Sequence, residues 1–541
     1  MPSRCTARRR RLRLPAALLT LGLVGAACGG GNGGEPIGQD ADEGAASAEE
    51  GAPEVGGSIT FGLESAVDSV DPANEMAQPA DKAVGLAIYD PLVSFDDQGG
   101  FVPYLAESFE SNEELTVWTV TLPADVQFHD GSPFNAAAVK AQFDRLLDPA
   151  TNCTCLPNID QITGIEIPDE ATVVFTLEAP NVAFPVILAG PQGWIASPTA
   201  VAALGNDGYD RAPVGTGPFV MADYANLVVE KNPDYWRTDG EGTPLPYLDS
   251  IDFEEIPDTG TRLQAVQAGD IDIMQTADTD TVVAAEEAGL EVQEVTGSSS
   301  TILFFNTTQP PFDDVTARRA VAFGMNRDRA NQIGYEGART ESYSPFAPGY
   351  EFFTEPDPEF PRYDPEQASA LVEEYEAEKG PLAFEVTCIP TPEADQILQL
   401  LQQDMAEIGI EVTLNSLDQG QFVPLVFGKS PEIEAGCFRG PQIADPDQLY
   451  DTLFSGAGGN ISQYSNPTVD EALTAGRSSA DTEIRKDAYA TVIEELAEDV
   501  PVIPTLYDLY GNVHRSEVHG LPSPENNALG AIKPTTLWVE Q

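Results

Sequence analysis

The sequence predicts an α/β protein with more than one domain. In the C-terminal half, an apolar run at 382–389, a helical pattern at 391–408, a run at 410–414, a further helical stretch and a run at 432–438 follow one another. Such β-α-β-α-β alternation is typical of a parallel sheet covered by helices. About 485 residues follow position 57, too many for one hydrophobic core, so two or three domains are expected.

Local patterns predict the individual elements. Ser58–Leu63 reads as a first strand, and residues 117–122 alternate between apolar and polar as a half-buried strand does. Asn135 is placed to cap a helix that runs to Leu147, with its apolar side chains on one stripe. Asp364, followed by proline and a glutamine at the third helical position, predicts a helix to about residue 378. The N-terminal half is richer in strand patterns.

The first 27 residues have the pattern of a secretory signal, with a cluster of arginines followed by the apolar stretch 14–27. Fourteen residues at ~1.5 Å each reach ~21 Å, short of a ~30 Å hydrocarbon core, so a cleaved signal is predicted instead of a membrane span. Cys28 follows small residues and resembles the acylated cysteine of bacterial lipoproteins, although Gly25 stands where leucine is usual. Residues 28–57 are rich in Gly, Ala, Glu and Asp and predict a flexible tether.

These N-terminal features predict an exported protein, anchored to the outer face of the cell membrane or periplasmic. The charge of the chain supports that setting. The net charge is −61, and because the signal holds six arginines, cleavage changes it to −67. A body this acidic excludes nucleic acid as a partner, since few cations are available to neutralise phosphates. Acidic residues spread through the whole chain also predict adaptation to high salt, which screens their repulsion.

Four cysteines, at positions 153, 155, 388 and 437, lie beyond Cys28. In an exported protein they predict disulfides, and four cysteines allow three pairings. Cys388 and Cys437 both lie on strand-like apolar runs and form a plausible pair. The chain has only three histidines, none close in sequence to a cysteine, so neither a metal site nor a cofactor is expected.

Short motifs occur in a fixed order from about residue 58 to 515. They are Ile88–Val93, Val102–Ser108, Val126–Ala136, Val214–Phe219, Asn232–Trp236, Gln267–Asp272, Phe305–Thr307, Pro310–Val315 with Ala320–Asp328, and Gln463–Pro467. The ordered set resembles the extracellular solute-binding proteins of ABC importers, in the peptide, nickel and oligopeptide group called family 5.

The resemblance implies a two-lobed periplasmic-binding-protein clamp of type II, with an extra subdomain inserted in lobe one. Lobe one is expected at 58–300 plus 510–541, its insertion at about 100–205 and lobe two at 301–509. Hinge segments are expected near 303–308 and 505–511. Such a protein is expected to be a monomer without enzymatic activity. It closes around its ligand and works with the permease and ATPase of an ABC importer.

One loop departs from the family pattern. Peptide binders of the family carry an aspartate that pairs with the ligand's ammonium group, and Gln442 stands at that position here. Arg439 stands where a tryptophan is usual, and either contacts a ligand carboxylate or pairs with one of the many acids. Asp445 is the alternative partner for an ammonium if the loop is shifted. The candidate ligand-binding residues are Glu64, Tyr89, Trp194, Phe305, Asn306, Arg439, Gln442 and Asp445; for the aromatic ones, core packing is the main alternative.

The sequence leaves several functions open. The leading one is capture of a peptide for import. The same fold could bind an oligosaccharide, a nickel chelate, haem or glutathione, or could report a ligand to a membrane partner as a signalling subunit. An extracellular hydrolase is a further alternative, but the chain has no G-x-S-x-G or H-E-x-x-H motif. The pair His129–Asp130 lies between a strand and a helix and predicts a structural turn.

Overall fold

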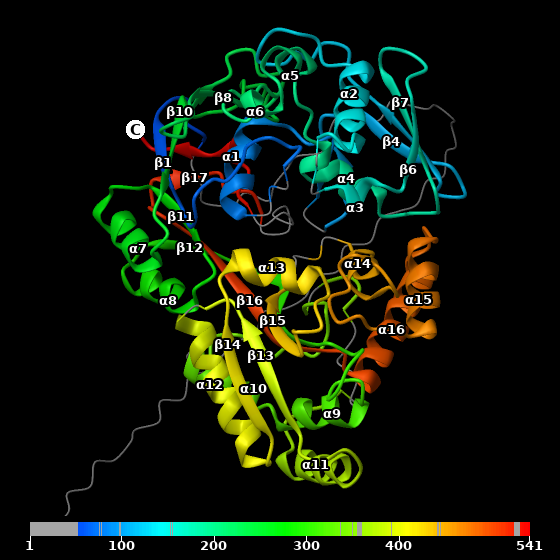
Figure 1. Cartoon of the computed structure of the whole chain (residues 1–541). Coiled ribbons are helices and arrows are strands. Elements are labelled where there is room, and N and C mark those ends of the chain that lie inside the picture. Colours follow the sequence, from blue (N-terminus) through cyan, green and yellow to red (C-terminus); the bar gives the residue numbers. More distant parts are fainter. Residues whose placement is uncertain are drawn as a thin grey trace, which may run out of the picture. The chain divides into compact units, whose positions relative to one another are not determined.

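The computed structural model describes residues 52–541, except 75, 77, 97–98, 152, 154, 336, 349, 354–359, 391, 441–442, 444 and 524–530. The predicted signal and Cys28 therefore lie outside the described residues. The described residues belong to one compact unit that extends to Gln541. Its architecture is built on one large sheet, two small sheets and one four-stranded sheet (Figure 1).

The large sheet has ten strands. Their order across the sheet is β14 (Glu411–Ser416), β13 (Ala383–Cys388), β15 (Ala435–Arg439), β12 (Glu291–Phe305), β16 (Val502–His514), β11 (Ile273–Thr276), β1 (Ser58–Leu63), β10 (Ser250–Glu255), β9 (Val228–Lys231) and β8 (Phe219–Asp223). The strand predicted at 58–63 is confirmed with the same bounds.

The long strands β12 and β16 connect the two halves of this sheet (Figure 1). They pair antiparallel from Glu291 opposite His514 to Phe304 opposite Val502, and the register shifts between Thr296 and Ile302. An extra residue in one strand bends and twists a ladder locally. The register shifts lie just before the hinge segment expected at 303–308 and do not coincide with it. The hinge positions stay a prediction.

The parallel α/β arrangement predicted for the C-terminal half is confirmed. β13 pairs parallel with both β14 and β15, and the elements between them are α12 (Pro392–Glu407) and α13 (Gln419–Phe427). The predicted helix after Asp364 is α11 (Pro365–Lys379), and the Asp364 carboxylate accepts a hydrogen bond from the Gln367 amide. Except for α13, whose Phe422 and Val426 belong to another core, these elements share an apolar core with α9 (Val315–Gly324).

The remaining helices of this half fall in the range expected for lobe two. They are α10 (Arg327–Gly334), α14 (Gln448–Leu453), α15 (Pro467–Arg477) and α16 (Thr482–Asp499). Helices α14, α15 and α16 enclose a second, separate core with Tyr489, Val492 and Leu473 at its centre. This core positions the loop that follows β15.

The range expected for lobe one contains the strands β1 and β8–β11 and five α-helices outside the four-stranded subdomain. Its helices are α1 (Pro79–Ile88), α5 (Pro198–Leu204), α6 (Asn206–Tyr209), α7 (Thr259–Ala268) and α8 (Thr279–Glu287). The C-terminal segment returns to this lobe through the pair β17 (Val518–His519) and β18 (Trp538–Val539) and the short helix η3 (Pro534–Thr536). The segment therefore carries Lys533 back to the beginning of the lobe.

A four-stranded sheet forms a separate subdomain with its own core. Its strands are β4 (Ser108–Ser111), β5 (Val117–Thr121), β7 (Thr172–Leu177) and β6 (Ile162–Glu166), and its helices are α2 (Ala136–Leu147), α3 (Leu156–Ile159) and α4 (Phe184–Ala189). The alternation predicted at 117–122 is confirmed, since Trp118, Val120 and Leu122 are buried. The Asn135 side chain caps α2 as predicted. Two further strands, β2 (Val93–Phe95) and β3 (Phe101–Pro103), form a hairpin beside it.

The chain passes from the apolar core of the four-stranded subdomain to the apolar core of lobe one near residue 195. Ile195 belongs to the core of the four-stranded subdomain, whereas Trp194, Ala196 and Ala200 belong to the core of lobe one. The end of the insertion, expected at about residue 205, stays a prediction. At the N-terminus, Gly56 donates to the Tyr247 carbonyl at 2.8 Å, so the last residues of the expected tether are bound to the body.

Two disulfides are present among the described residues. Cys388 on β13 is joined to Cys437 on β15, the pair that the sequence predicts, and Cys153 is joined to Cys155. In the described part of the chain, no helix is long and apolar enough to cross a membrane. No group of three or more His, Cys, Asp and Glu side chains there is arranged to hold a metal ion.

Candidate ligand-binding site

The aromatic candidates of lobe one, Tyr89 and Trp194, are part of its core. They are 1% and 0% exposed and stack with their ring centroids 6.1 Å apart. The Tyr89 hydroxyl donates to the Val70 carbonyl and lies 3.0 Å from the Tyr209 hydroxyl. Gly85 leaves the space for Trp194, because a β-carbon there would lie 2.3 Å from the indole ring. Tyr89 and Trp194 thus pack in the hydrophobic core of lobe one.

Glu64 occupies a different position, directly after the end of β1. It is half-buried, and its charge acts on Arg262, whose guanidinium is buried and donates to the carbonyls of Ile256 and Gln275. Burial lowers the pKa of Arg262, and the negative charge of Glu64 partly offsets this effect. The neighbouring Ser65 hydroxyl is buried and has no hydrogen-bond partner among the described residues.

In lobe two, Phe305 and Asn306 lie at the end of β12. Phe305 is fully buried and packs on Phe312, with ring centroids 4.2 Å apart. Asn306 is 3% exposed; its amide donates to the Ile433 carbonyl, and its side-chain oxygen accepts from the Thr308 amide. It also borders a small concavity with Lys429 and Gln463 at the end of α13. The hydrogen bonds of Asn306 therefore hold the loops around this concavity together.

The loop after β15 holds the other three candidates. Arg439 pairs in the sheet with Thr301, and the next amide, of Gly440, donates to the Ser300 carbonyl. The side chain of Arg439 and the whole of Gln442 lie outside the described residues. Their proposed ligand contacts stay predictions. The loop itself starts where β12 and β16 shift register.

Asp445 is buried and engaged in an ion pair. Arg485 of α16 donates to its carboxylate at 2.6 Å, and the Asp447 amide donates to the same oxygen at 2.8 Å. Burial raises the pKa of Asp445, while the charge of Arg485 lowers it. Binding a ligand ammonium at Asp445 would require replacing Arg485, so the structure does not leave this carboxylate open to a ligand.

A second pair holds the same loop. The Arg477 guanidinium of α15 donates to both oxygens of Asp447, at 2.8 and 2.7 Å, and lies 3.6 Å from the centroid of the Tyr450 ring. Two-pronged arginine–carboxylate contacts combine charge with fixed geometry. Sequence reasoning missed both arginines. The one hint in the sequence was that Lys and Arg are scarce in this chain, so that each of them can be expected to have a specific partner.

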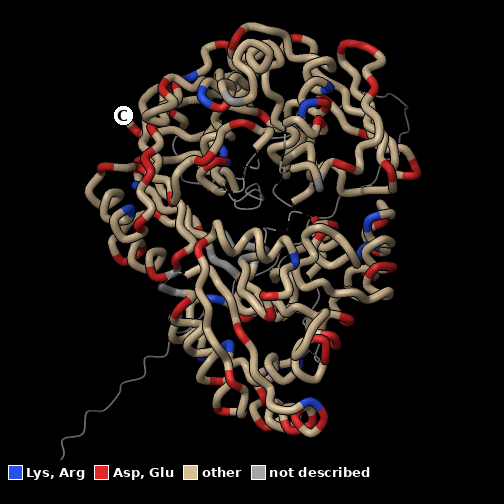
Figure 2. The backbone as a smooth tube through the Cα atoms, in the orientation of Figure 1, with Lys and Arg blue, Asp and Glu red and all other residues tan. Residues whose placement is uncertain are grey.

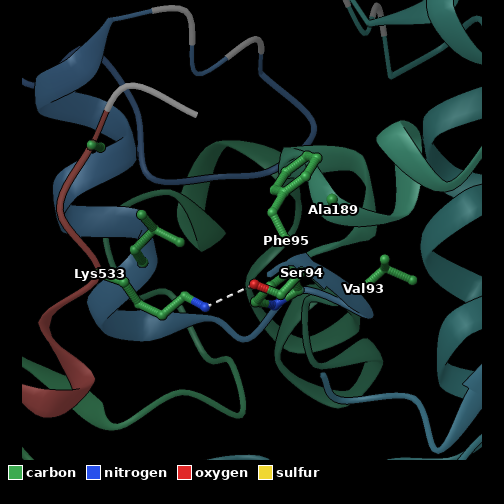
Figure 3. Close-up of a pocket in the computed structure, with 8 residues that line it drawn as sticks. Val93, Ser94, Phe95, Ala189 and Lys533 are labelled. Atoms are coloured by element: carbon green, nitrogen blue, oxygen red, sulfur yellow. Dashed lines mark hydrogen bonds between the residues drawn. The ribbon is translucent and has the colours of Figure 1, made fainter. Parts of the chain in front are cut away.

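Lobe one contains a small pocket that the sequence did not reveal (Figure 3). Its walls are mostly apolar side chains from the end of α1, from β2 and from the end of α4, together with Ala531. Its polar groups are the Ser94 hydroxyl and the Lys533 ammonium, which donates to Ser94 at 3.1 Å. Lys533 comes from the returning C-terminal segment, more than 400 residues from Ser94. No local motif could have linked the two.

A buried polar and aromatic network is centred on Asp90, whose carboxyl group is influenced by the charge of Lys533. Asp90 is 2% exposed and accepts hydrogen bonds from the Tyr235 hydroxyl at 2.9 Å and the Trp236 indole at 2.8 Å. Burial raises the pKa of Asp90, and the cations Arg237 and Lys533 partly oppose this shift. The hydrogen bonds to Asp90 fix the orientation of the Tyr235 and Trp236 side chains.

Comparisons with known proteins identify the family. The family described as bacterial extracellular solute-binding proteins, family 5, matches residues 100–460, more than half of the chain. The chain belongs to this family. Glutathione-binding protein GsiB of Pectobacterium atrosepticum is 29% identical over 454 residues, which cover 81% of this chain and 85% of that protein. GsiB of Salmonella typhimurium is also 29% identical, over 462 residues.

Solved structures agree with this membership. The binding protein DppA of Helicobacter pylori in complex with the peptide STSA matches with a TM-score of 0.75 and 25% identity, covering 90% of this chain and 99% of that chain. The binding protein AgaA of A. tumefaciens R10 in complex with agropinic acid matches with a TM-score of 0.77 and 24% identity over the same shares. The two-lobed clamp predicted from the sequence is thus confirmed. The chain is an extracellular solute-binding protein, and GsiB, DppA and AgaA are binding proteins too.

The contacts of His129 are with the backbone of a neighbouring loop. Its ring Nε2 lies 3.0 Å from the Gly217 carbonyl, and burial lowers its pKa to about 4. Asp130 accepts hydrogen bonds from the hydroxyls of Ser132 and Ser197. These contacts tie the turn before α2 to the loop around Gly217. They agree with the structural turn that the sequence predicts.

Proposed function

We propose that this protein captures a short peptide or a peptide-like solute of the glutathione type and delivers it to the permease of an ABC importer. The observation that carries the proposal is the similarity to glutathione-binding proteins along four fifths of the chain. The fold shared with a peptide-bound DppA supports the same class of ligand. The protein would act by closing its two lobes around the solute, which the permease then receives.

Recognition of the ligand would differ from simple pairing of an ammonium with Asp445. That carboxylate is held by Arg485, and Gln442 offers an uncharged oxygen at the position where the family pattern has an aspartate. A neutral acceptor gives a weaker bond to an ammonium than a carboxylate does. The N-terminal amine of the ligand would therefore contribute less to affinity than in typical peptide binders.

The test is a thermal-shift and calorimetric screen of the chain without its signal, in high salt. The probes are peptides of three to eight residues, free and N-acetylated, and glutathione. A rise of several degrees in melting temperature with peptides or glutathione is the expected result, with only a small loss on acetylation. Binding of none of these probes would overturn the proposal. In that case sugars, metal chelates and haem form the next set of probes.

We also propose that Cys28 carries the lipid that anchors the protein outside the cell. The small residues before Cys28 and the polar stretch after it support this proposal. Cys28→Ser should move the protein from the membrane fraction to the medium or periplasm. Cys5→Ser, in the segment that cleavage removes, is the matched control and should leave it in the membrane. Retention of the Cys28→Ser variant in the membrane would contradict the anchor.

A further inference from the structure

The four-stranded subdomain and the helices α14–α16 are packed separately. Among the described residues, their apolar cores have no member in common. The two parts nevertheless touch, because the backbone amide of Val182 donates a hydrogen bond to the carbonyl of Arg477 at 2.9 Å. Val182 lies in the loop between β7 and α4, and Arg477 is the last residue of α15. We call the contact between Val182 and Arg477 the seam.

On one side of the seam, the loop that carries Val182 is held by its own subdomain. The neighbouring Asn181 is 3% exposed; its amide donates to the Leu115 carbonyl at 3.0 Å, and its carbonyl accepts from the Trp118 indole at 3.2 Å. Its side-chain oxygen accepts from the Ala183 amide at 2.8 Å. The amides on both sides of Val182 are thus bonded within the subdomain, whereas the Val182 amide is bonded across the seam.

On the other side, Arg477 connects the seam to the loop after β15. The last carbonyls of a helix have no partner within that helix, and the carbonyl of Arg477 accepts from Val182 instead. The guanidinium of the same residue donates to both oxygens of Asp447 and lies on the Tyr450 ring. The seam therefore shares a residue with the ion pair that fixes the loop after β15.

Acidic side chains lie on both sides of the seam. On the subdomain side they are Asp160 and Glu178. Both are held near the loop of Val182 through Gln161, which follows Asp160 in sequence. The Gln161 carbonyl accepts from the Glu178 amide, and its side chain accepts from the side chain of Asn181, both at 2.8 Å.

The acid on the other side is Asp451 of α14, directly after the Tyr450 that lies on Arg477. All three acidic residues are exposed to solvent. Partial burial raises the pKa of Asp160, and the negative charges of Glu178 and Asp451 raise it further. Asp451 is therefore close enough to Asp160 for their charges to repel each other across the seam.

Salt acts differently on the two components of the seam. A hydrogen bond between two peptide groups contributes little net stability, because both groups bind water when the contact opens. Repulsion between exposed charges extends over ~10 Å at 0.1 M salt and over only ~3 Å at 1 M. Raising the salt concentration therefore removes the repulsion and leaves the hydrogen bond.

We infer that the seam is a salt-dependent clasp of the closed form, which holds the four-stranded subdomain against α14–α16 at high salt and releases it in dilute solution. A contact that exists only in the closed form shifts the population towards that form. The clasp would therefore raise the affinity for the solute as salt increases, since less of the free energy of binding is needed for closure. The inference goes beyond the proposed function, because it concerns closure of the empty protein and does not depend on which solute is bound.

Hydrogen exchange of single backbone amides tests the clasp. The chain without its signal is exchanged in the absence of ligand at about 0.2 M and about 2 M NaCl. Mass spectrometry with electron-transfer fragmentation then measures Val182 separately from Asn181 and Ala183. Exchange at Val182 reports opening of the seam, whereas exchange at the two neighbouring amides reports opening of the subdomain itself.

Two variants with the same change of charge sharpen the test. Asp451→Lys places a cation opposite Asp160, and Glu373→Lys is the matched control, because Glu373 is exposed on α11, which packs in a different core. In wild type, exchange at Val182 should slow about fivefold at the higher salt, as for one pair of unit charges in contact in water. The two neighbouring amides should change little. Asp451→Lys should exchange slowly already at the lower salt, and Glu373→Lys should follow wild type.

The inference is overturned if the Val182 amide exchanges at the same rate at both salt concentrations, or if all three amides slow together. It is also overturned if Asp451→Lys, with a wild-type melting temperature, keeps the salt dependence of wild type. Should Asp451→Lys fail to fold, Asp160→Lys is the second variant and carries the same expectation. The proposed function stands in each of these cases, because no ligand is present. Absence of binding by every peptide and by glutathione would instead overturn the proposed function and leave the clasp.

Discussion

The loop after β15 in lobe two and the pocket of lobe one use their few cations in opposite ways. In the loop, Arg485 and Arg477 are bound to Asp445 and Asp447 by short ion pairs. In the pocket, Lys533 lies against a hydroxyl and an aromatic ring. The first arrangement neutralises charge and fixes a loop, whereas no carboxylate among the described residues forms an ion pair with Lys533. In a chain this acidic, a cation of the described region without a carboxylate partner is the more informative observation.

The largest effect on stability is expected from salt, which screens the repulsion between exposed acidic residues but acts little on buried ion pairs. Acidic residues are spread along the whole trace of the protein (Figure 2), and their repulsion extends over ~30 Å at 0.01 M salt but only ~3 Å at 1 M. We expect the free energy of unfolding to fall by several kcal/mol when NaCl is reduced from about 1 M to about 10 mM. Urea unfolding at both concentrations measures this. Equal stability at the two concentrations would contradict adaptation to salt.

The largest effect of a single substitution is expected in the loop of lobe two. Asp445→Ala leaves the Arg485 guanidinium buried without its partner, which should cost about 3–5 kcal/mol of unfolding free energy. Urea unfolding is the measurement. The double variant Asp445→Leu with Arg485→Met should recover most of the loss, since no buried charge is left. A loss of under about 1 kcal/mol in Asp445→Ala would mean that the pair does not hold the loop.

His129 adds a dependence on pH in lobe one. Its folded pKa of about 4 lies below the ordinary 6.5, so the unfolded chain binds a proton more readily. The stability that neutral His129 contributes is fully present above pH 6.5 and is lost as the pH falls towards 4. Because the ring is partly exposed, we expect about 2 kcal/mol. His129→Gln should flatten this part of the pH profile, and an unchanged slope would refute the assignment.

Lys533→Met should lower the free energy of unfolding by under about 1 kcal/mol, because only a cation–aromatic contact and one hydrogen bond are lost. Lys140→Met is the matched substitution on the surface and should change stability by about a few tenths of a kcal/mol. Thermal unfolding of both variants measures the difference. A loss of several kcal/mol in Lys533→Met would show that Lys533 stabilises the fold as Arg485 does, and the contrast between the two regions would disappear.

Local sequence patterns predicted many elements correctly. The strand Ser58–Leu63, the helix capped by Asn135 and the helix capped by Asp364 are confirmed. Such features depend on residues within a few positions of each other, because a cap or an alternating pattern acts over one or two turns. The ordered motifs predicted the family and the two-lobed clamp for the same reason, since each motif is a short local segment.

The candidate site was predicted less well. Tyr89, Trp194 and Phe305 lie in cores, and sequence cannot tell an aromatic residue that packs in a core from one that faces a ligand. Asp445 is an ammonium partner in the sequence-based prediction, but Arg485 lies 40 positions away in sequence and 2.6 Å away in space. The pairing of Lys533 with Ser94 was not predicted, because their contact joins the two ends of lobe one.

By itself, then, the sequence determined the charge, the predicted export signal, the local elements and the membership of family 5. Only the tertiary structure decided which charges are neutralised and which are kept. The physical reason is that the state of an ionisable group depends on desolvation and on neighbours within a few Å. In this fold those neighbours come from segments tens to hundreds of residues apart, as Asp445 with Arg485 and Ser94 with Lys533 illustrate.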